Sequence, residues 1–285
     1  MKNKKLYKIW TFLLVIALIA GTFIFTDNYN VRATEYTVEA ATLPKSFDNF
    51  KIVQISDLHN TEFGKDNEKL LKIIKEQNPD VVVVTGDTID GFFTNIQIPI
   101  KLFEEVLEIC DVYLVVGNHE IRSDSTLYFD FLDTLTEMGV VVLKDESAYI
   151  EKNGEKIQVI GLNDASNYKA VYGDTYKETL TEAINTLDEE DTFTVLLSHH
   201  PELFKEYAKT DVDLVFSGHA HGGQVRIPFL GGIIAPDQGV LPQYTEGSFT
   251  ENNTTMIVSR GLGNSIIPLR INNPPEVVVV NLKAK

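Results

Sequence analysis

The stretch Val-Val-Val-Val-Thr-Gly-Asp, residues 81–87, decides the fold. Its four consecutive valines predict a strand that is buried on both faces, as the strands of a parallel sheet between helix layers are. The preceding segments support this prediction. Residues 51–56 are another apolar run of strand length, and residues 67–77 carry apolar side chains at helical spacing. A strand, a helix and a strand in this order predict parallel pairing through a right-handed crossover.

The alternation of strands and helices continues through the first half of the chain and changes in the second half. The further helices and strands expected in the first half are 99–109, 112–116, 125–138 and 140–143. Consecutive strands are expected in the second half, with a hairpin turn at Asn153-Gly154. We therefore predict an α/β fold in which two mixed β-sheets pack together and are flanked by helices, an α-β-β-α sandwich.

The N-terminal segment predicts a membrane helix. Residues 9–26 carry no charge, four lysines precede them, and as a helix they would span about 27 Å. We expect residues 1–26 to be a cytoplasmic stub and a single-pass transmembrane anchor, 27–48 a tether, and 49–285 one domain outside the cytoplasm. A cleavable signal peptide is the alternative, but its apolar region is usually shorter, about 7–15 residues.

Composition excludes one class of partner. The net charge is −16, and a field of this sign repels nucleic acid, so no nucleic-acid partner is expected. An anionic substrate is not excluded, because bound divalent cations invert the potential locally. The single cysteine, Cys110, excludes an intramolecular disulfide.

All six histidines lie just after predicted strands, beside Asp or Asn. Ligands gather at the carboxyl ends of strands in α/β folds, and imidazole and carboxylate groups bind first-row divalent metals. The candidate donors are Asp57, His59, Asp87, Asn118, His199, His219 and His221. Each alone would suit a turn or a cap, but together they exceed one tetrahedral site and suit two metal ions about 3.5–4 Å apart.

The order of these groups resembles the calcineurin-like metallophosphoesterase superfamily. Its motif series is Asp-x-His, Gly-Asp-x-x-Asp, Gly-Asn-His-Asp/Glu, His and Gly-His-x-His. All five motifs occur in order here, beginning at Asp57, Gly86, Gly117, His199 and Gly218. A closer resemblance is to a membrane-anchored or exported bacterial branch of phosphohydrolases, and it is carried by Gly218–Gln224, Val258–Gly263 and Pro268–Arg270. The resemblance implies that 49–285 is a metallophosphoesterase domain.

The resemblance also implies which residues bind metal. One ion would be held by Asp57, His59 and His221, and the other by Asn118, His199 and His219. Asp87 would bridge the two divalent ions. Histidine, carboxylate and amide ligands of this kind suit Mn, Fe or Zn.

Further roles follow from the same resemblance. His119 would be catalytic, contacting the phosphate or protonating the leaving oxygen. Asp90 and Glu120 would orient the metal ligands. Arg260 and Arg270 are candidates for binding the substrate phosphate.

The pair His199-His200 leaves one ambiguity. The family pattern is His-x-Pro, and Pro201 makes His199 the expected ligand. Successive side chains at a strand end face opposite ways, so His200 is expected outside the ligand set.

These observations predict a membrane-anchored phosphohydrolase that uses two divalent metal ions, a phosphodiesterase or pyrophosphatase acting outside the cytoplasm on a lipid- or wall-linked phosphoester. One alternative is a non-catalytic metal-binding module on the same fold; relatives of that kind have lost ligands, and no ligand is lost here. Another is a metal-dependent hydrolase of a different bond, such as a peptide. Substrate specificity is expected to lie in the loops 91–98, 164–176 and 228–250.

Overall fold

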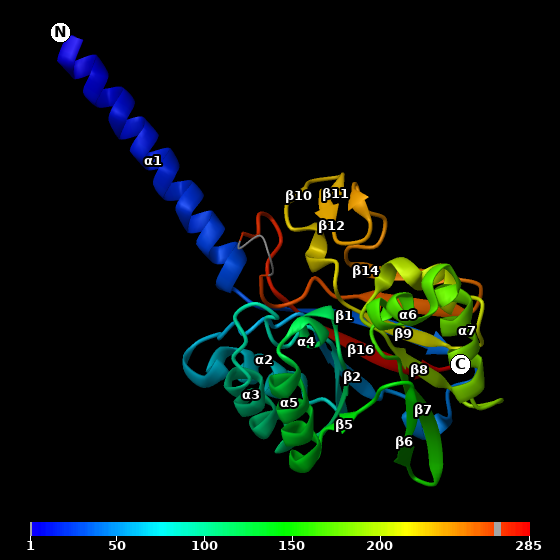
Figure 1. Cartoon of the computed structure of the whole chain (residues 1–285). Helices are drawn as coiled ribbons and strands as arrows, with labels where there is room; N and C mark the ends of the chain where they lie inside the picture. The colour runs from blue at the N-terminus through cyan, green and yellow to red at the C-terminus, as the bar shows by residue number, and fades with distance from the viewer. Residues whose placement is uncertain (1, 265–268) are drawn as a thin grey trace.

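The computed structural model describes residues 2–264 and 269–285 of the chain. Two six-stranded sheets pack face to face, and helices cover their outer faces (Figure 1). The strand order is β1-β16-β2-β3-β4-β5 in the first sheet and β14-β15-β9-β8-β7-β6 in the second. Both sheets mix parallel and antiparallel pairs, so the predicted α/β sandwich of two mixed sheets is confirmed.

The first sheet forms around the valine run that decides the fold. Its strands are β1 (Arg32–Ala40), β2 (Lys51–Ile55), β3 (Val81–Thr85), β4 (Asp111–Val115), β5 (Val141–Val142) and β16 (Glu276–Ala284). Strands β2 to β5 are parallel and alternate with the helices α2 (Glu68–Gln77), α3 (Gln97–Leu107) and α5 (Ser125–Met138). Every residue of β3 is buried, as the sequence predicted.

The second sheet is built from strands that come later in the chain. Its members are β6 (Glu146–Lys152), β7 (Glu155–Gly161), β8 (Thr194–Leu197), β9 (Leu214–Ser217), β14 (Gly247–Glu251) and β15 (Thr254–Val258). The helices α6 (Ala165–Tyr172), α7 (Tyr176–Leu187) and α8 (Phe204–Tyr207) accompany it. Strands β6 and β7 form the predicted hairpin, because Asn153 and Gly154 both take the positive φ that a two-residue turn needs.

Alternation along the strands divides the core into layers. In β3, Val81 and Val83 pack between the two sheets, whereas Val82 and Val84 pack under the helices of the first sheet. A third apolar layer lies between the second sheet and its helices and includes Leu196. Because side chains point to alternate faces, each central strand joins two apolar layers and holds its carboxyl end in a fixed place.

The tether predicted over 27–48 is wrong for most of its length. Residues 32–40 form β1, which pairs in parallel with β16 along its whole length. Phe47, in the short helical turn η1 (Lys45–Phe47), is completely buried. The alternation was hard to see in the sequence because β1 is an edge strand, with only Val38 buried. The folded domain therefore begins near residue 32.

The N-terminal segment forms one helix, α1 (Lys2–Tyr29), which projects from the domain (Figure 1). A helix over 9–26 was predicted and is present. Within the part of the chain that the structure describes, however, no helix is long and apolar enough to cross a membrane. The transmembrane prediction is therefore not supported.

Two small hairpins stand apart from both sheets, at the upper edge of the domain in Figure 1. They pair β10 (Arg226–Ile227) with β11 (Gly231–Gly232), and β12 (Ile234–Ala235) with β13 (Gly239–Val240). The backbone of Ile233 joins them by donating to Val225 O at 2.9 Å and accepting from Leu241 N at 2.9 Å. We call residues 225–243 the flap.

Candidate metal centre

The predicted metal ligands meet at the carboxyl ends of five strands. They follow β2 (Asp57, His59), β3 (Asp87), β4 (Asn118), β8 (His199) and β9 (His219, His221). All are buried, with between 0 and 6% of their surface exposed. The sheets place these side chains together because the parallel strands end at the same edge.

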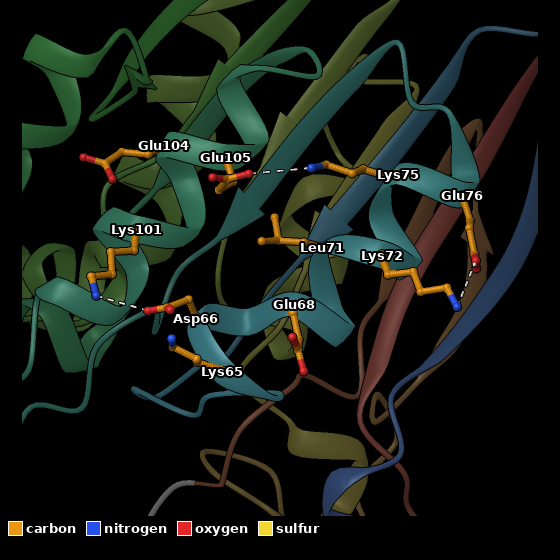
Figure 2. A pocket seen from close by; sticks show the side chains of 10 residues that line it. All are labelled: Lys65, Asp66, Glu68, Leu71, Lys72, Lys75, Glu76, Lys101, Glu104 and Glu105. Carbon is orange, nitrogen blue, oxygen red and sulfur yellow. Dashed lines mark hydrogen bonds and ion pairs between the residues drawn. The ribbon is translucent and has the colours of Figure 1, made fainter.

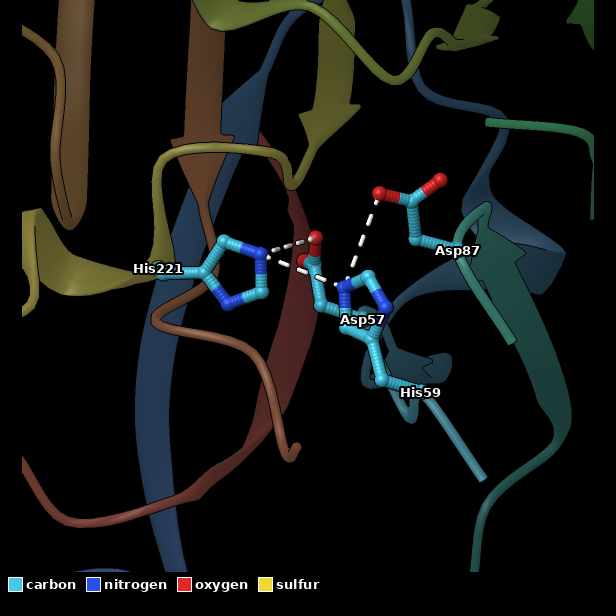
Figure 3. Close-up of side chains that lie close together, drawn as sticks. All are labelled: Asp57, His59, Asp87 and His221. Atoms are coloured by element: carbon cyan, nitrogen blue, oxygen red, sulfur yellow. Dashed lines mark hydrogen bonds and ion pairs between the residues drawn. The ribbon is translucent and has the colours of Figure 1, made fainter. Parts of the chain in front are cut away.

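The first cluster consists of Asp57, His59, Asp87 and His221, whose donor atoms lie within 4.8 Å of one another (Figure 3). The Nε2 atoms of His59 and His221 are 3.2 Å apart, and His221 Nε2 is 3.5 Å from Asp57 Oδ1. His59 Nε2 is 3.6 Å from Asp87 Oδ2. Donors of one tetrahedral ion with bonds of about 2.1 Å are separated by about 3.4 Å, so this spacing fits a cation between them.

The second cluster contains Asp87 again, with His199 and His219. His199 Nε2 is 3.2 Å from Asp87 Oδ2 and 3.1 Å from His219 Nδ1. Asn118 Oδ1 is buried and has no hydrogen-bond partner among the described residues. A cation would give that oxygen a partner. One oxygen of Asp87 therefore faces both clusters, as the bridging role predicted for it requires.

The ionisation of the first cluster suits metal binding. Burial lowers the pKa of His59 to about 3 and the pKa of His221 well below its usual value. Both rings are therefore neutral and present lone pairs, which is the form that binds a metal. Burial raises the pKa of Asp57 to about 6, although His199 counteracts this. Above that pH Asp57 is a carboxylate, and its negative charge attracts a cation.

His199 and Asp87 shift each other's pKa strongly. Burial would raise the pKa of Asp87, but the nearby His199 outweighs it and holds that pKa well below its usual range. Burial likewise opposes a charge on His199, and Asp87 raises its pKa above the usual value. A proton on His199 and a divalent cation would compete for the same Nε2 lone pair, so metal binding at this cluster would release a proton.

Outer hydrogen bonds orient the ligands of the second cluster. His199 Nδ1 donates to the backbone oxygen of Thr85 at 2.6 Å, which leaves Nε2 as the metal-binding nitrogen. His219 Nε2 donates to Asp237 Oδ2 at 3.0 Å, which leaves Nδ1. Bonds of this kind fix both the tautomer and the ring orientation of a metal-binding histidine.

Glu120 has the contacts expected of a ligand-orienting residue. Its carboxylate accepts hydrogen bonds from the backbone N–H groups of Asp87 at 2.8 Å, Thr88 at 2.6 Å and Gly117 at 2.8 Å. These bonds fix the turn that carries the shared Asp87. Gly117 is needed for the close approach, because a Cβ there would lie 2.7 Å from Asp87 N.

His119 lies beside the first cluster and outside the ligand set. Its ring is 4.5 Å from the ring of His59, between centroids. The backbone N–H of Gly91 donates to His119 Nδ1 at 3.1 Å, and Asp90 Oδ2 is 3.8 Å from the same nitrogen. When Nδ1 accepts, the neutral ring carries its proton on Nε2, which can then donate a hydrogen bond.

His200 was expected to lie outside the ligand set, and the structure places it directly behind the second cluster. Its ring is 4.3 Å from that of His219, between centroids. His200 Nε2 donates to Asp164 Oδ2 at 2.8 Å and Nδ1 donates to Glu202 Oε1 at 2.7 Å. Despite burial, these two carboxylates raise the pKa of His200 to about 10. It is therefore a buried imidazolium, and its ring packs against the ring of His219.

Three acidic residues around His219 were missed in the sequence. They are Asp164, Glu202 and Asp237. Glu202 had a weak signal, since it stands two residues after His200. Asp164 caps α6 and Asp237 lies in the β12–β13 turn, and each looks like an ordinary cap or turn residue in the sequence.

The two arginines predicted to bind substrate form hydrogen bonds and ion pairs with other residues of the chain. Arg270 is completely buried and donates to the backbone oxygens of Arg260 at 2.9 Å and Gly263 at 2.5 Å. Arg260 pairs with Glu276 at 2.8 Å and with Glu246 at 3.2 Å. These contacts give both residues structural partners, and their contact with substrate stays a prediction. Pro268 of the predicted Pro268–Arg270 motif lies outside the described residues.

A surface groove of about 820 Å³ lies between α2 and α3, away from the predicted metal ligands (Figure 2). Nine of its ten lining residues are charged, and none is a histidine. Three of its four lysines pair with acidic neighbours, for example Lys75 with Glu105 at 3.6 Å. Exposed pairs of this kind contribute little stability, and the groove contains none of the predicted metal ligands.

Comparison with known proteins agrees with this geometry. A family model described as calcineurin-like phosphoesterase matches residues 50–223. The "Uncharacterized metallophosphoesterase YkuE" of Bacillus subtilis (strain 168) is 32% identical over 265 residues, which cover 91% of this chain and 88% of the relative. An "Uncharacterized metallophosphoesterase" of Aquifex aeolicus (strain VF5) is 30% identical, covering 95% of this chain and 98% of the relative.

A third relative has a more specific name. The "Phosphodiesterase YaeI" of Escherichia coli (strain K12) is 25% identical over 239 residues, which cover 82% of each chain. The family match includes all seven predicted metal ligands, since they lie between residues 57 and 221. The chain belongs to the calcineurin-like phosphoesterase family and is a metal-dependent phosphoester hydrolase.

Proposed function

We propose that this chain is a phosphodiesterase or pyrophosphatase with two divalent metal ions in its site. One observation carries the proposal: Asp87 Oδ2 lies 3.6 Å from His59 Nε2 and 3.2 Å from His199 Nε2. A single carboxylate oxygen therefore belongs to two groups of buried donors, which is what a dinuclear site needs. Divalent cations held there would polarise the phosphoryl oxygens and make a bound water more acidic.

The chain's own residues supply the remaining steps. Asp57, His59 and His221 would hold one cation, and Asn118, His199 and His219 the other, with Asp87 between them. His119 would donate a hydrogen bond from Nε2–H to the leaving oxygen and stabilise the charge that develops there, while Gly91 N holds the ring through Nδ1 and Asp90 lies beside that nitrogen. Burial of the site excludes bulk water and strengthens each electrostatic contact with the phosphate.

A diester or pyrophosphate substrate is favoured over a monoester. The name of the Escherichia coli relative, a phosphodiesterase, supports this choice. We propose a lipid- or wall-linked phosphoester as the substrate class. Mn, Fe and Zn all suit the mixed ligand set.

The location of the site is a part of the proposal that rests on the sequence. Four lysines precede the uncharged run 9–26, and this bias favours a catalytic domain outside the cytoplasm. Protease treatment of intact cells stripped of their wall tests it. Digestion of the domain in intact cells supports an external site, and protection until lysis contradicts it. Alkaline extraction of the same membranes tests whether the chain is held in them.

A non-catalytic metal-binding module is the second candidate. It would bind the same ions tightly and hydrolyse no phosphoester. The complete ligand set and the position of His119 beside the first cluster disfavour it.

The test uses the full chain, stripped of metal and resupplied with Mn, Fe or Zn. Hydrolysis of bis-p-nitrophenyl phosphate and p-nitrophenyl phosphate is compared side by side. Metal-dependent cleavage with a faster rate on the diester supports the proposal. Tight binding of metal with no turnover of either compound contradicts it and favours the binding module. Asp66→Asn, a change at an exposed surface ion pair, is the matched control for changes at Asp87.

A further inference from the structure

The flap exposes six large apolar side chains. Phe229 is fully exposed and Val240 is 72% exposed. The remaining members of this set are Ile227, Leu230, Ile234 and Leu241. Soluble surfaces seldom gather so many apolar side chains on one small element, and such patches mark interaction sites.

The flap also contacts the metal centre. Asp237, in the β12–β13 turn, accepts a hydrogen bond from the ligand His219 at 3.0 Å. Gln238 is bonded to the backbone of Tyr244 through both ends of its amide, at 2.7 and 2.9 Å. A surface that binds the exposed apolar side chains of the flap would therefore lie close to the metal ligand His219.

The charge of the flap indicates which kind of partner can bind it. Only Arg226 and Asp237 are charged among residues 225–243, so the flap carries no net charge in a chain of net charge −16. A second copy of the chain would bring another large negative charge towards the first. An apolar lipid layer lacks this penalty, and the flap, which carries no net charge, can approach it.

The flap and the helix α1 both form hydrogen bonds to the segment 270–271. Asn28, near the end of α1, donates to the backbone oxygen of Arg270 at 3.2 Å. The next residue, Ile271, accepts from Arg226 N at 3.0 Å. Figure 1 shows that α1 and the β10–β12 hairpins leave the domain on the same side. Trp10 and Phe12 of α1 are also exposed. The flap and α1 therefore both expose apolar side chains on one side of the domain.

We propose that the flap inserts its apolar side chains into a lipid surface and that the metal centre hydrolyses a phosphodiester of a lipid in that surface. This inference rests on the proposed function and names its substrate class. In the reaction, the oxygen of water bonds to phosphorus and the ester P–O bond breaks. One proton of the water ends on the leaving oxygen and the other on the new phosphate group.

Insertion is measured with a single tryptophan. Trp10 is the chain's only tryptophan, so the full chain with W10F and F229W reports on the flap alone. The control is W10F with F129W, because Phe129 is exposed on α5, which Figure 1 places far from the flap. With vesicles of phosphatidylcholine that carries brominated acyl chains, we expect quenching at position 229 and none at 129. Absence of quenching at 229, or equal quenching at both positions, overturns the proposal.

Turnover gives a second, independent readout. The F229S L230S variant is compared with the unchanged chain on bis-p-nitrophenyl phosphate in solution and on hexadecyl p-nitrophenyl phosphate embedded in phosphatidylcholine vesicles. Loss of two apolar contacts should lower the vesicle rate by about tenfold or more and leave the solution rate unchanged. Equal vesicle rates for the two proteins overturn the proposal. If the unchanged chain hydrolyses neither compound, the proposed function itself fails, whereas quenching still decides insertion.

Discussion

The two metal-ligand clusters differ in how their histidines are held. In the second cluster, the outer nitrogens of His199 and His219 are bonded to Thr85 O and Asp237. In the first cluster, the Nδ1 atoms of His59 and His221 are buried and have no hydrogen-bond partner among the described residues. The second cluster is therefore oriented by the protein before a metal binds, and the first depends more on the metal itself.

The largest expected effect comes from the residue that the clusters share. Asp87→Asn keeps the shape and removes the charge that faces both His59 and His199. We expect turnover of bis-p-nitrophenyl phosphate to fall by at least about 10³-fold and metal content to fall at both clusters. Wild-type turnover and metal content in this variant, measured beside Asp66→Asn, would contradict a shared ligand.

A change at His119 should separate chemistry from metal binding. His119→Asn removes the Nε2–H donor beside the first cluster and changes no metal ligand, so turnover should fall by about 10²–10³-fold while metal content stays the same. The loss should be smaller for a substrate whose leaving group needs no proton. Rates for a series of aryl diesters of different leaving-group pKa check this. An equal loss across the series would show that His119 does not act on the leaving oxygen.

The support behind the second cluster should depend on pH. Asp164 and Glu202 raise the pKa of His200 to about 10, and His200 lowers the pKa of Asp164. The contribution of His200 is complete below its unfolded pKa of about 6.5 and is lost as pH rises through 10, whereas that of Asp164 is lost only as pH falls below about 4.

His200→Asn should therefore lower the free energy of unfolding most between about pH 4 and 6.5, by about 3 kcal/mol. The difference from the unchanged chain should shrink towards pH 10. Thermal unfolding of the metal-free chains at pH 5.5 and 9.5 measures it. A difference that grows with pH would contradict the buried imidazolium.

The smallest expected effect tests the orientation of His219 directly. Asp237→Asn weakens the acceptor at His219 Nε2, so the affinity of the second cluster for metal should fall by about 10–100-fold, with the first cluster unchanged. Isothermal titration calorimetry of the metal-free chain with Zn²⁺ resolves the affinities of the two sites. Equal weakening of both would mean that the clusters are not held differently.

The edge that carries the metal ligands could be predicted from the sequence because its signals are local. The valine run of β3 predicts a strand buried on both faces, and Asp87 follows directly after it. Strand β1 could not be predicted in this way, because its partner β16 lies at the other end of the chain and the outward residues of β1 are polar. The role of Asp237 could not be predicted either, since only tertiary packing brings the β12–β13 turn onto His219. A contact between loops that are far apart in the chain produces no characteristic residue spacing in the sequence.

The central claim is that two metal ions share Asp87, and one measurement tests it most directly. The stripped full chain is loaded with Mn²⁺, its metal content is counted, and its electron paramagnetic resonance spectrum is recorded. We predict two ions per chain with the signal of a spin-coupled pair, and loss of that coupling in Asp87→Asn. One ion per chain, or two ions without coupling in the unchanged protein, would contradict the account.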